Sequence, residues 1–592
     1  MVGIGRPSVA VPPCRVWVMS RPVYGSFKGY RVAWLRGDVI AALTLWALLV
    51  PQCLAYASIA GLPPVVGLYA AVPALLLYAA LGSSRHLVVA PISATAALSA
   101  GTVAVFADPA SRQFVALSAA LAIVTGVLAL LAGALRLGFL ASFISEPVLK
   151  GLIMGLALII IVGQLPKLFG VSKGSGDFFQ RLWELTKQLG QTSGWTLAVG
   201  VASLVVIFAL KRWLPVVPGS LVAVVLGIVA VAVFRLEDKG VAIVGHIEPG
   251  LPRIGLPQVR AGDYLALVGP AAGLLLVGFA EGLGAAKTYA ARVGDDVAPN
   301  RELLAVGAAN VGAGLCSGMV VNGSLSKTAV NGDAGARSQL STMLVAALTV
   351  VTLQFLTGLF EYLPEATLAA VVIAAVVELV DIPALRQLYL VWTRRLGGIY
   401  GLAARADFVA AMAAMLGVLI FDTLPGLFIG IAVSILLLTY RASRPHVALL
   451  LRATDPGPGG GAIWVDAERH PDAEAEPGVV VVRVESGLFF VNADFVRQRI
   501  RDVVTPETWA VVLDGETSPA IDITATTMLA HLADGLARQG VTLLVAHHIG
   551  QVRDVLQIAG ATEQLRRVYP TVDAAVTAAR SLRPLQEPDA SS

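Results

Sequence analysis

A single lysine, Lys327, lies in a polar segment, residues 322–331 (NGSLSKTAVN), between two of the most hydrophobic regions of the chain. A lysine at the centre of a bilayer costs about 2.5–3.5 kcal/mol, so it usually faces a wet cavity or a partner. Gly323 permits a break in the chain, and the Ser324 hydroxyl can cap a half-helix. Because a helix N-terminus binds anions through unpaired N–H groups and its dipole, the segment predicts an anion site. The alternative is that Lys327 reaches an interface or pairs with a carboxylate.

A second stretch, residues 90–96 (APISATA), is also too short and polar to span a membrane by itself. If it too begins a half-helix, two positive helix ends face each other. The predicted anion ligands then include backbone groups at Ile92 and Ser93 and at Leu325 and Ser326. The hydroxyls of Ser324 and Ser326 and the Lys327 ammonium complete this part of the predicted site.

Gln52 directly follows Pro51 in the first long apolar run. Its uncharged amide could donate a hydrogen bond to an oxyanion and is a predicted ligand. An equally good interpretation is that it satisfies backbone groups freed by the proline. Tyr56, one helical turn later, is expected to pack rather than to bind.

Glu281 is the charged residue of the apolar run LLLVGFAEGL, residues 274–283. A carboxyl group desolvated in such a run is suited to take up a proton and carry it with the anion. Alternatively, Glu281 stays ionised and forms a structural pair with Lys327. Both states can occur in one transport cycle, with the pair present in the empty site.

The composition is that of a membrane protein. The chain has 592 residues, is 56% hydrophobic and 14% charged, and has a mean hydropathy of +0.77. The net charge of +4, without a basic run interleaved with aromatics, argues against nucleic acid as a partner. The three cysteines show no metal-ligand or disulfide spacing. No nucleophile, zinc or nucleotide motif is present, so we expect neither an enzyme nor a cofactor, and a gradient rather than ATP must supply the energy.

Fourteen candidate membrane segments follow an N-terminal segment of residues 1–37. An even number of spans places both termini on one side, and the arginines and lysines before the first span and in alternate connections assign that side to the cytoplasm. A basic loop at about 165–193 is the exception to this rule. The expected segments are 38–60, 66–82, 92–107, 113–135, 139–163, 195–211, 217–234, 263–286, 302–320, 325–335, 340–360, 366–380, 407–423 and 425–440.

The two short segments lie roughly 230 residues apart, as expected for an inverted repeat of seven segments plus seven with a binding site near the bilayer midplane. The same offset relates two interruptions of long spans, at Pro51–Gln52 and at Glu281. The predicted transmembrane transport domain covers residues 38–440.

The chain changes character after residue 440. Residues 441–477 are expected to hold a linker and the start of a soluble region, because residues 455–461 are rich in glycine and proline. Apolar strands then alternate with helices, which predicts a small α/β domain over residues 478–585. The expected elements are strands 479–484, 510–513 and 541–546 and helices 494–504, 523–538 and 549–559.

These motifs resemble those of the sulfate permease family. The resemblance covers nearly the whole chain. It rests on the segments VPQCLAYA (50–57), AGLPPVVGLY (60–69), GSSRH (82–86), AEG (280–282), GSLSKTAVN (323–331) and GARSQL (335–340). It implies a polytopic α-helical membrane protein with a seven-plus-seven inverted repeat, core and gate domains, an anion held between the third and tenth helices, and transport by an elevator movement. Most relatives have arginine where this chain has Lys327.

The resemblance also identifies the soluble region as a STAS domain, on the segments GLFFVNA (487–493), VVLD (511–514) and IDIT (521–524). Thr524 matches the phosphorylatable position of bacterial anti-sigma antagonists and is a candidate regulatory site. Family members form dimers, so a homodimer is expected. Glu281 matches the proton-coupling position of plant-type sulfate symporters, which favours proton-coupled sulfate symport in a bacterial plasma membrane. Sodium-coupled bicarbonate or dicarboxylate transport, or a passive anion channel or exchanger, is the alternative.

Overall fold

The computed structural model describes residues 24–582 apart from 28–29, 110, 140–144, 173, 175, 215–216, 247–248, 378–379, 391–404, 422, 454–461, 548–551, 553–554 and 556–567. The chain forms two compact units. The first comprises residues 1–388 and 407–432, and the second comprises residues 389–406 and 433–592.

Each of the fourteen expected membrane segments overlaps a helix in the described part of the chain. Eight of the described helices are long and apolar enough to cross a membrane. The helices are α1 Leu35–Ile59, α2 Val65–Leu81, α3 Ser93–Ala104, α4 Arg112–Ala134, α5 Glu146–Phe169, α7 Gly194–Trp213, α8 Gly219–Phe234, α10 Val268–Val293, α11 Pro299–Leu315, α12 Leu325–Asp333, α13 Leu340–Val351, α14 Glu365–Val377, α17 Ala406–Phe421 and α18 Thr423–Ser443. Further helices are α6 Phe178–Gln188, α9 Ala261–Ala266 and α15 Ile382–Leu390.

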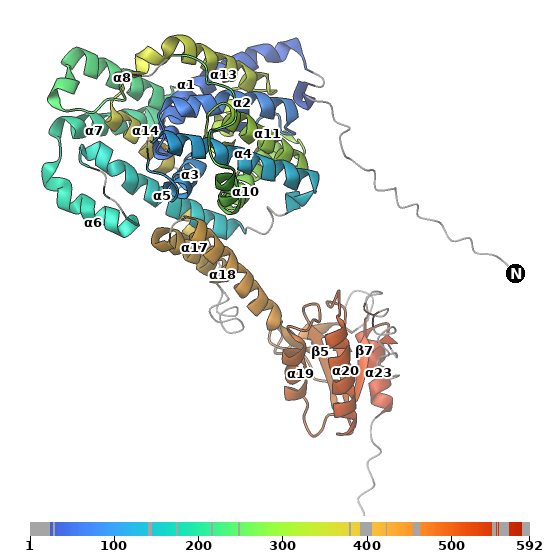
Figure 1. Cartoon of the computed structure of the whole chain (residues 1–592). Coiled ribbons are helices and arrows are strands. Elements are labelled where there is room, and N and C mark those ends of the chain that lie inside the picture. Colours follow the sequence, from blue (N-terminus) through green and yellow to red (C-terminus); the bar gives the residue numbers. More distant parts are fainter. Residues whose placement is uncertain are drawn as a thin grey trace, which may run out of the picture. The chain divides into compact units, whose positions relative to one another are not determined.

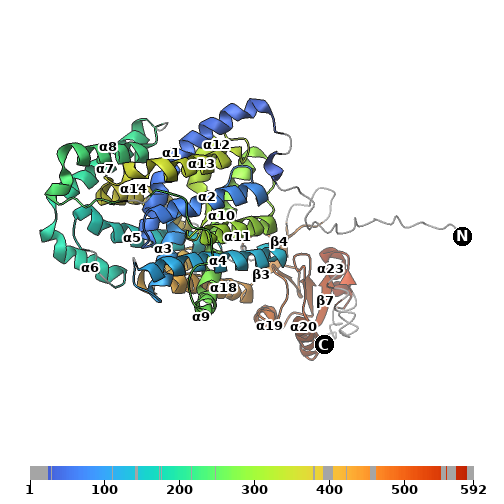
Figure 2. The same ribbon diagram turned by 45° about the horizontal axis from the view of Figure 1, so that its top comes forward.

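The membrane helices of the first unit pack in two groups. In the core group, α11 packs along α4 and α2, α13 packs on α2 and α1, and α10 packs on α4. In the gate group, α14 packs on α5 and α7, and α7 packs on α8. Figures 1 and 2 show α7, α8 and α14 on the opposite side of the unit from α10 and α11. The groups meet where α1 contacts α8 and α14 and where α3 contacts α5.

A two-stranded antiparallel pair lies inside the core group. Strand β1 (Val88–Ala90) pairs with β2 (Asn322–Ser324), with Val89 opposite Gly323. Helix α3 begins three residues after β1 ends, and α12 begins directly after β2. The strand pair therefore fixes the starts of the two short helices. Each short helix follows the strand of its own repeat.

Two details of the long helices differ from expectation. Neither Pro51 nor Glu281 interrupts its span, because α1 and α10 are continuous through these positions. Within a packed membrane bundle, neighbouring groups can satisfy the backbone that a proline frees. Asp38 lies in the first turn of α1, and its carboxylate accepts the backbone N–H groups of Arg337 at 2.7 Å and Ser338 at 3.2 Å, ahead of α13. It therefore ties α1 to the second repeat.

The second unit contains a six-stranded sheet in the order β4-β3-β5-β6-β7-β8. The strands are β3 Val447–Arg452, β4 Trp464–Asp466, β5 Val479–Val484, β6 Ala510–Asp514, β7 Thr542–Ala546 and β8 Val568–Tyr569. Helices α19 (Ala493–Asp502) and α20 (Ile523–Ala537) cover one face, and α23 (Val572–Ser581) covers the other. The predicted strands and the first two predicted helices are present, whereas the helix expected at 549–559 and the segment 455–461 lie outside or mostly outside the described residues. Strands β3 and β4 come from the region expected to hold a linker.

Candidate functional site

The first turn of α12 combines an open helix end with a buried cation. Ser324 is the N-cap, and its Oγ accepts the backbone N–H of Lys327 at 3.4 Å. Leu325 is 49% exposed and Ser326 is also exposed, whereas the Lys327 side chain is 0% exposed. The first two residues of the helix are thus reachable from outside the protein, with a full positive charge directly behind them.

The Lys327 ammonium joins the two short helices. It donates to the carbonyl oxygen of Pro91, just ahead of α3, at 3.1 Å. It also lies 4.8 Å from the centroid of the Tyr56 ring, within the range of a cation–π contact. The interpretation that Lys327 reaches the membrane interface is therefore wrong, because the side chain is buried between α1, α12 and the start of α3.

Helix α3 begins without a side-chain cap. Its N-cap residue, Ile92, is extended and offers no polar side-chain atom, and both Ile92 and Ser93 are buried. The first N–H groups of a helix have no partner within the helix, so a buried end without a cap needs another acceptor. The start of α3 therefore offers unpaired donors beside the Lys327 charge.

Glu281 approaches the same place from α10. The helix packs closely against β2 through glycines: a Cβ atom on Gly282 would lie 3.0 Å from Asn322 Oδ1, and one on Gly323 would lie 2.9 Å from the Gly282 Cα. Glu281 Oε2 is buried and has no hydrogen-bond partner among the described residues. Among the described contacts, no ion pair joins Glu281 to Lys327, so the salt-bridge alternative does not apply to this conformation.

Gln52 lies on the face of α1 that carries Tyr56, four residues apart. Its side chain is buried, and within the described part of the chain its Oε1 atom has no hydrogen-bond partner. The structure therefore brings Gln52, Lys327 and the starts of α3 and α12 into one region. It also gives Tyr56, which we expected to pack, a contact with the cation.

Buried amides and hydroxyls that the sequence analysis did not single out hold this region together. The Asn310 side chain accepts the Val321 N–H at 3.0 Å and donates to the Val321 carbonyl at 2.9 Å, which fixes the entry to β2. Thr328 Oγ1 accepts the Val88 N–H at 3.1 Å, and Asn331 Nδ2 donates to the His86 carbonyl at 3.1 Å. Asn310 lies inside an apolar span, and polar residues in such spans often have a structural or functional role, so the sequence could have identified it.

Glu302 supports the turn ahead of β1. Its carboxylate is buried and accepts hydrogen bonds from the Tyr78 hydroxyl at 2.7 Å and from the Ser83 hydroxyl at 2.6 Å. The backbone N–H groups of Ser83 and Ser84 donate to the same carboxylate. The two buried carboxylates Asp38 and Glu302 thus each hold a turn of the opposite repeat.

Thr524 lies in the second unit and belongs to a different site. It is exposed in the first turn of α20, whose N-cap Asp522 accepts the Ala525 N–H at 2.8 Å. A phosphate placed there would meet the positive end of the helix dipole.

Comparisons with known proteins agree with this architecture. The sequence profile described as the sulfate permease family matches residues 35–397, and the STAS domain profile matches residues 470–575. A protein of Mycobacterium tuberculosis named probable sulfate transporter is 37% identical over 94% of this chain and 97% of its own length. Sulfate transporter 1.1 of Arabidopsis thaliana is 28% identical over 94% of this chain and 87% of its own.

Solved structures share the fold. The murine solute carrier 26 family member A9 anion transporter, in its inward-facing state, superimposes with a TM-score of 0.84 at 22% identity, over 97% of this chain and 96% of that one. The transmembrane domain of a cyanobacterial bicarbonate transporter superimposes with a TM-score of 0.58 at 22% identity, over 67% of this chain and 98% of that one. With its helical membrane region and C-terminal STAS domain, this chain is a member of the sulfate permease family.

Proposed function

We propose that this protein is a proton-coupled sulfate symporter that holds its anion between the first turns of α3 and α12. The observation that carries the proposal is the buried Lys327 ammonium, which reaches from α12 to the Pro91 carbonyl at the start of α3. The names of full-length relatives from a bacterium and a plant support sulfate as the anion.

The arrangement suits an oxyanion. Sulfate presents several acceptor oxygens, and the starts of the two helices offer N–H donors at Ser93 on one side and at Leu325 and Ser326 on the other. The hydroxyls of Ser324 and Ser326, 3.3 Å apart, and the amide of Gln52 can add donors. Lys327 supplies charge without the two-pronged fork of an arginine, so the helix ends set the geometry of binding.

Glu281 is the proposed proton carrier. No described residue donates a hydrogen bond to its buried Oε2 atom, and a carboxylate in that position is costly to keep charged. Protonation removes this cost when the anion arrives, and release of the proton restores a negative charge within electrostatic range of Lys327 in the empty site. Proton and anion would thereby cross together.

The two helix groups support an elevator movement. The proposed ligands on α1, α3 and α12 belong to the core group, and this group meets the gate group at contacts of α1 and α3. In the proposed cycle the core group moves as one body past the gate group. We further propose a homodimer in the bacterial plasma membrane with both termini in the cytoplasm, domain limits as given above, and regulation at Thr524.

The proposal is tested by uptake of radiolabelled sulfate into proteoliposomes with an imposed inward proton gradient. The wild-type protein should accumulate sulfate above equilibrium, and bicarbonate or dicarboxylates should compete poorly. Glu281→Gln should abolish proton-driven accumulation while sulfate–sulfate exchange remains measurable, because the anion ligands are intact.

Glu146→Gln is the matched control, because this exposed carboxylate pairs with Lys150 at 2.8 Å within α5 and is not one of the proposed ligands. It should accumulate sulfate like the wild type. Unchanged proton-driven uptake in Glu281→Gln would refute the proton role. Uptake driven by a sodium gradient but not by a proton gradient would replace the symport proposal with sodium coupling.

A further inference from the structure

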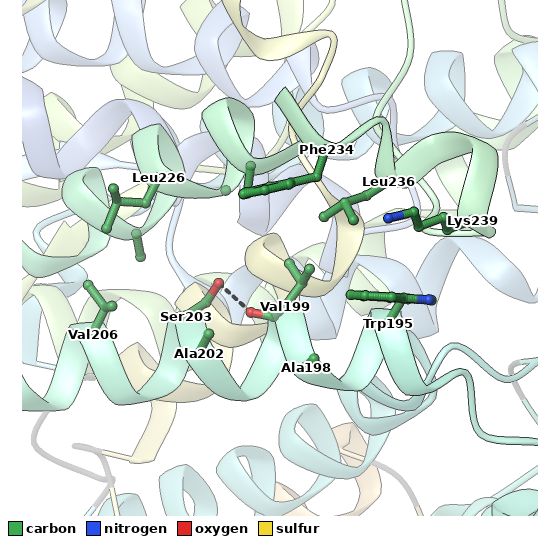
Figure 3. Close-up of a pocket in the computed structure, with 13 residues that line it drawn as sticks. Trp195, Ala198, Val199, Ala202, Ser203, Val206, Leu226, Phe234, Leu236 and Lys239 are labelled. Carbon is green, nitrogen blue, oxygen red and sulfur yellow. Dashed lines mark hydrogen bonds between the residues drawn. The ribbon is translucent and has the colours of Figure 1, made fainter. Parts of the chain in front are cut away.

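A groove between α7 and α8 lies far from the anion site in the sequence and has no part in the proposed mechanism. Its volume is about 440 Å³, within the range of roughly 300–1,000 Å³ typical of ligand sites. Its lining is apolar apart from Ser203 and Lys239 (Figure 3). The Ser203 hydroxyl is already engaged by the Val199 carbonyl at 2.8 Å and by Thr367 at 3.0 Å. The groove therefore fits a hydrocarbon better than a polar solute.

The groove faces away from the protein interior. Helix α7 is the least enclosed of the long spans that precede α10. Several groove residues are themselves largely exposed, including Trp195 at 53%, Leu226 at 51% and Phe234 at 63%. For two spans at the edge of a membrane bundle, we expect such an exposed apolar surface to contact lipid.

The length of the groove matches one leaflet of a bilayer. Along α7 its lining runs from Trp195 to Val206, and along α8 it runs from Ala223 to Phe234. Eleven helical steps of 1.5 Å give about 16 Å, which is about half of the ~30 Å hydrocarbon core. Figure 3 shows Val206 and Leu226 at one end of the groove and Trp195 and Lys239 at the other.

A cation lies at the end of the groove that corresponds to the membrane surface. Lys239 Nζ lies 4.5 Å from the centroid of the Trp195 ring, and tryptophan and lysine favour the level of the lipid headgroups. Glu237 and Asp238, on the same short helical turn, do not line the groove. Lys239 is therefore the charged residue of the groove lining.

A second lysine–tryptophan pair marks the same surface. Helix α6 ends shortly before α7 begins, and Lys187 Nζ lies 5.4 Å from the Trp183 ring. The helix exposes Phe179 and Trp183 and carries Arg181. We expect an amphipathic helix of this kind to lie in the plane of the membrane surface. Such a placement would also account for the basic loop that breaks the positive-inside rule, because the cations of the helix could meet anionic lipid.

We propose that the groove between α7 and α8 binds one acyl chain of an anionic phospholipid, whose phosphate contacts Lys239. In the topology proposed above this lipid lies in the outer leaflet. Because the groove belongs to the gate group, the bound lipid would fill the surface between two gate helices without touching the anion site. The inference does not depend on the identity of the transported anion.

The proposal is tested by fluorescence quenching of the full-length protein in vesicles that contain phosphatidylglycerol or phosphatidylcholine brominated on an acyl chain. The chain has nine tryptophans, so the signal of Trp195 is the difference between the wild type and Trp195→Phe. Brominated phosphatidylglycerol should quench this signal at about fivefold lower mole fraction than brominated phosphatidylcholine, the ratio expected from one lysine near an anionic lipid.

Lys239→Gln should remove the preference for phosphatidylglycerol. Ala202→Phe fills the groove and should lower the quenching of Trp195 to one level that is the same for both lipids, as expected for bulk lipid alone, whereas Val205→Phe, on an exposed position outside the groove, should leave the quenching unchanged. Equal quenching by the two lipids in the wild type would overturn the headgroup contact. Absence of Trp195 quenching, as expected if a second copy of the chain covers the groove, would overturn the lipid site itself.

Discussion

The two short helices of the core group begin at the same pair of strands but differ in what their first turns offer. Helix α12 has a serine cap, an exposed first turn and a buried lysine at its third residue. Helix α3 follows an isoleucine without a capping atom, its first turn is buried, and it carries no charge. Both repeats therefore provide a short helix that begins at the strand pair, whereas the positive charge comes from α12. We expect α12 to contribute most of the free energy of anion binding. The uncapped N–H groups of α3 should contribute a smaller part.

Removing the charge of α12 should have the largest effect. Lys327→Gln keeps a side chain of similar reach but loses the ammonium, so sulfate binding should weaken about 10- to 100-fold, as for loss of a charged hydrogen bond. Equilibrium binding of radiolabelled sulfate to purified protein measures this change.

Lys327→Arg tests whether charge alone suffices, and it should recover most of the affinity. Lys287→Gln, at an exposed lysine of α10, is the control and should bind sulfate normally. If Lys327→Gln binds sulfate as tightly as the wild type, the positive charge on α12 does not contribute to sulfate binding.

Disturbing the strand pair should affect both helices together. A Cβ atom at Gly323 would lie 2.9 Å from the backbone of Gly282, so Gly323→Ala forces α10 and β2 apart. Overpacking of this kind costs about 1–3 kcal/mol, and thermal unfolding followed by intrinsic fluorescence should show a lower midpoint together with reduced sulfate uptake.

The control is Gly284→Ala on the same helix, where an added Cβ meets open space. This variant should match the wild type in both measurements. A normal midpoint and normal uptake in Gly323→Ala would show that close packing of α10 on β2 is not needed to position the helices.

Giving α3 a cap should have the smallest effect. The hydroxyl introduced by Ile92→Thr can accept an N–H of the first turn and compete with the anion, which should weaken sulfate binding by roughly fivefold. Ile92→Val has the same shape without the hydroxyl and corrects for lost packing. Equal affinities of the two variants would indicate that the anion does not use the donors of α3.

Much of the membrane region follows from local sequence signals. Long apolar runs predict the spans, and the polar interruptions at 90–96 and 322–331 predict the two short helices. Lys327 could be identified as a candidate ligand because a lysine between apolar segments usually faces a wet cavity or a partner. The i,i+4 pair of Glu146 and Lys150 could also be predicted, because both residues lie on one helix.

Contacts between distant parts of the chain could not be predicted in this way. Asp38 accepts N–H groups about 300 residues away, and the Lys327 contact with Tyr56 joins helices of different repeats. A proline inside a span does not show from the sequence whether the helix continues, because the packing around it decides. Strands β3 and β4 were missed because they flank a segment whose glycines and prolines dominate the local signal.

The most direct test of the account is a structure of the protein with bound selenate, a sulfate analogue whose selenium can be located by anomalous scattering. The account predicts a selenium position between α3 and α12, with oxygens about 2.7–3.2 Å from the backbone nitrogens of Ser93 and Leu325 and with Lys327 beside it. Selenium located elsewhere in the membrane region, with both helix starts unoccupied, would contradict the central claim.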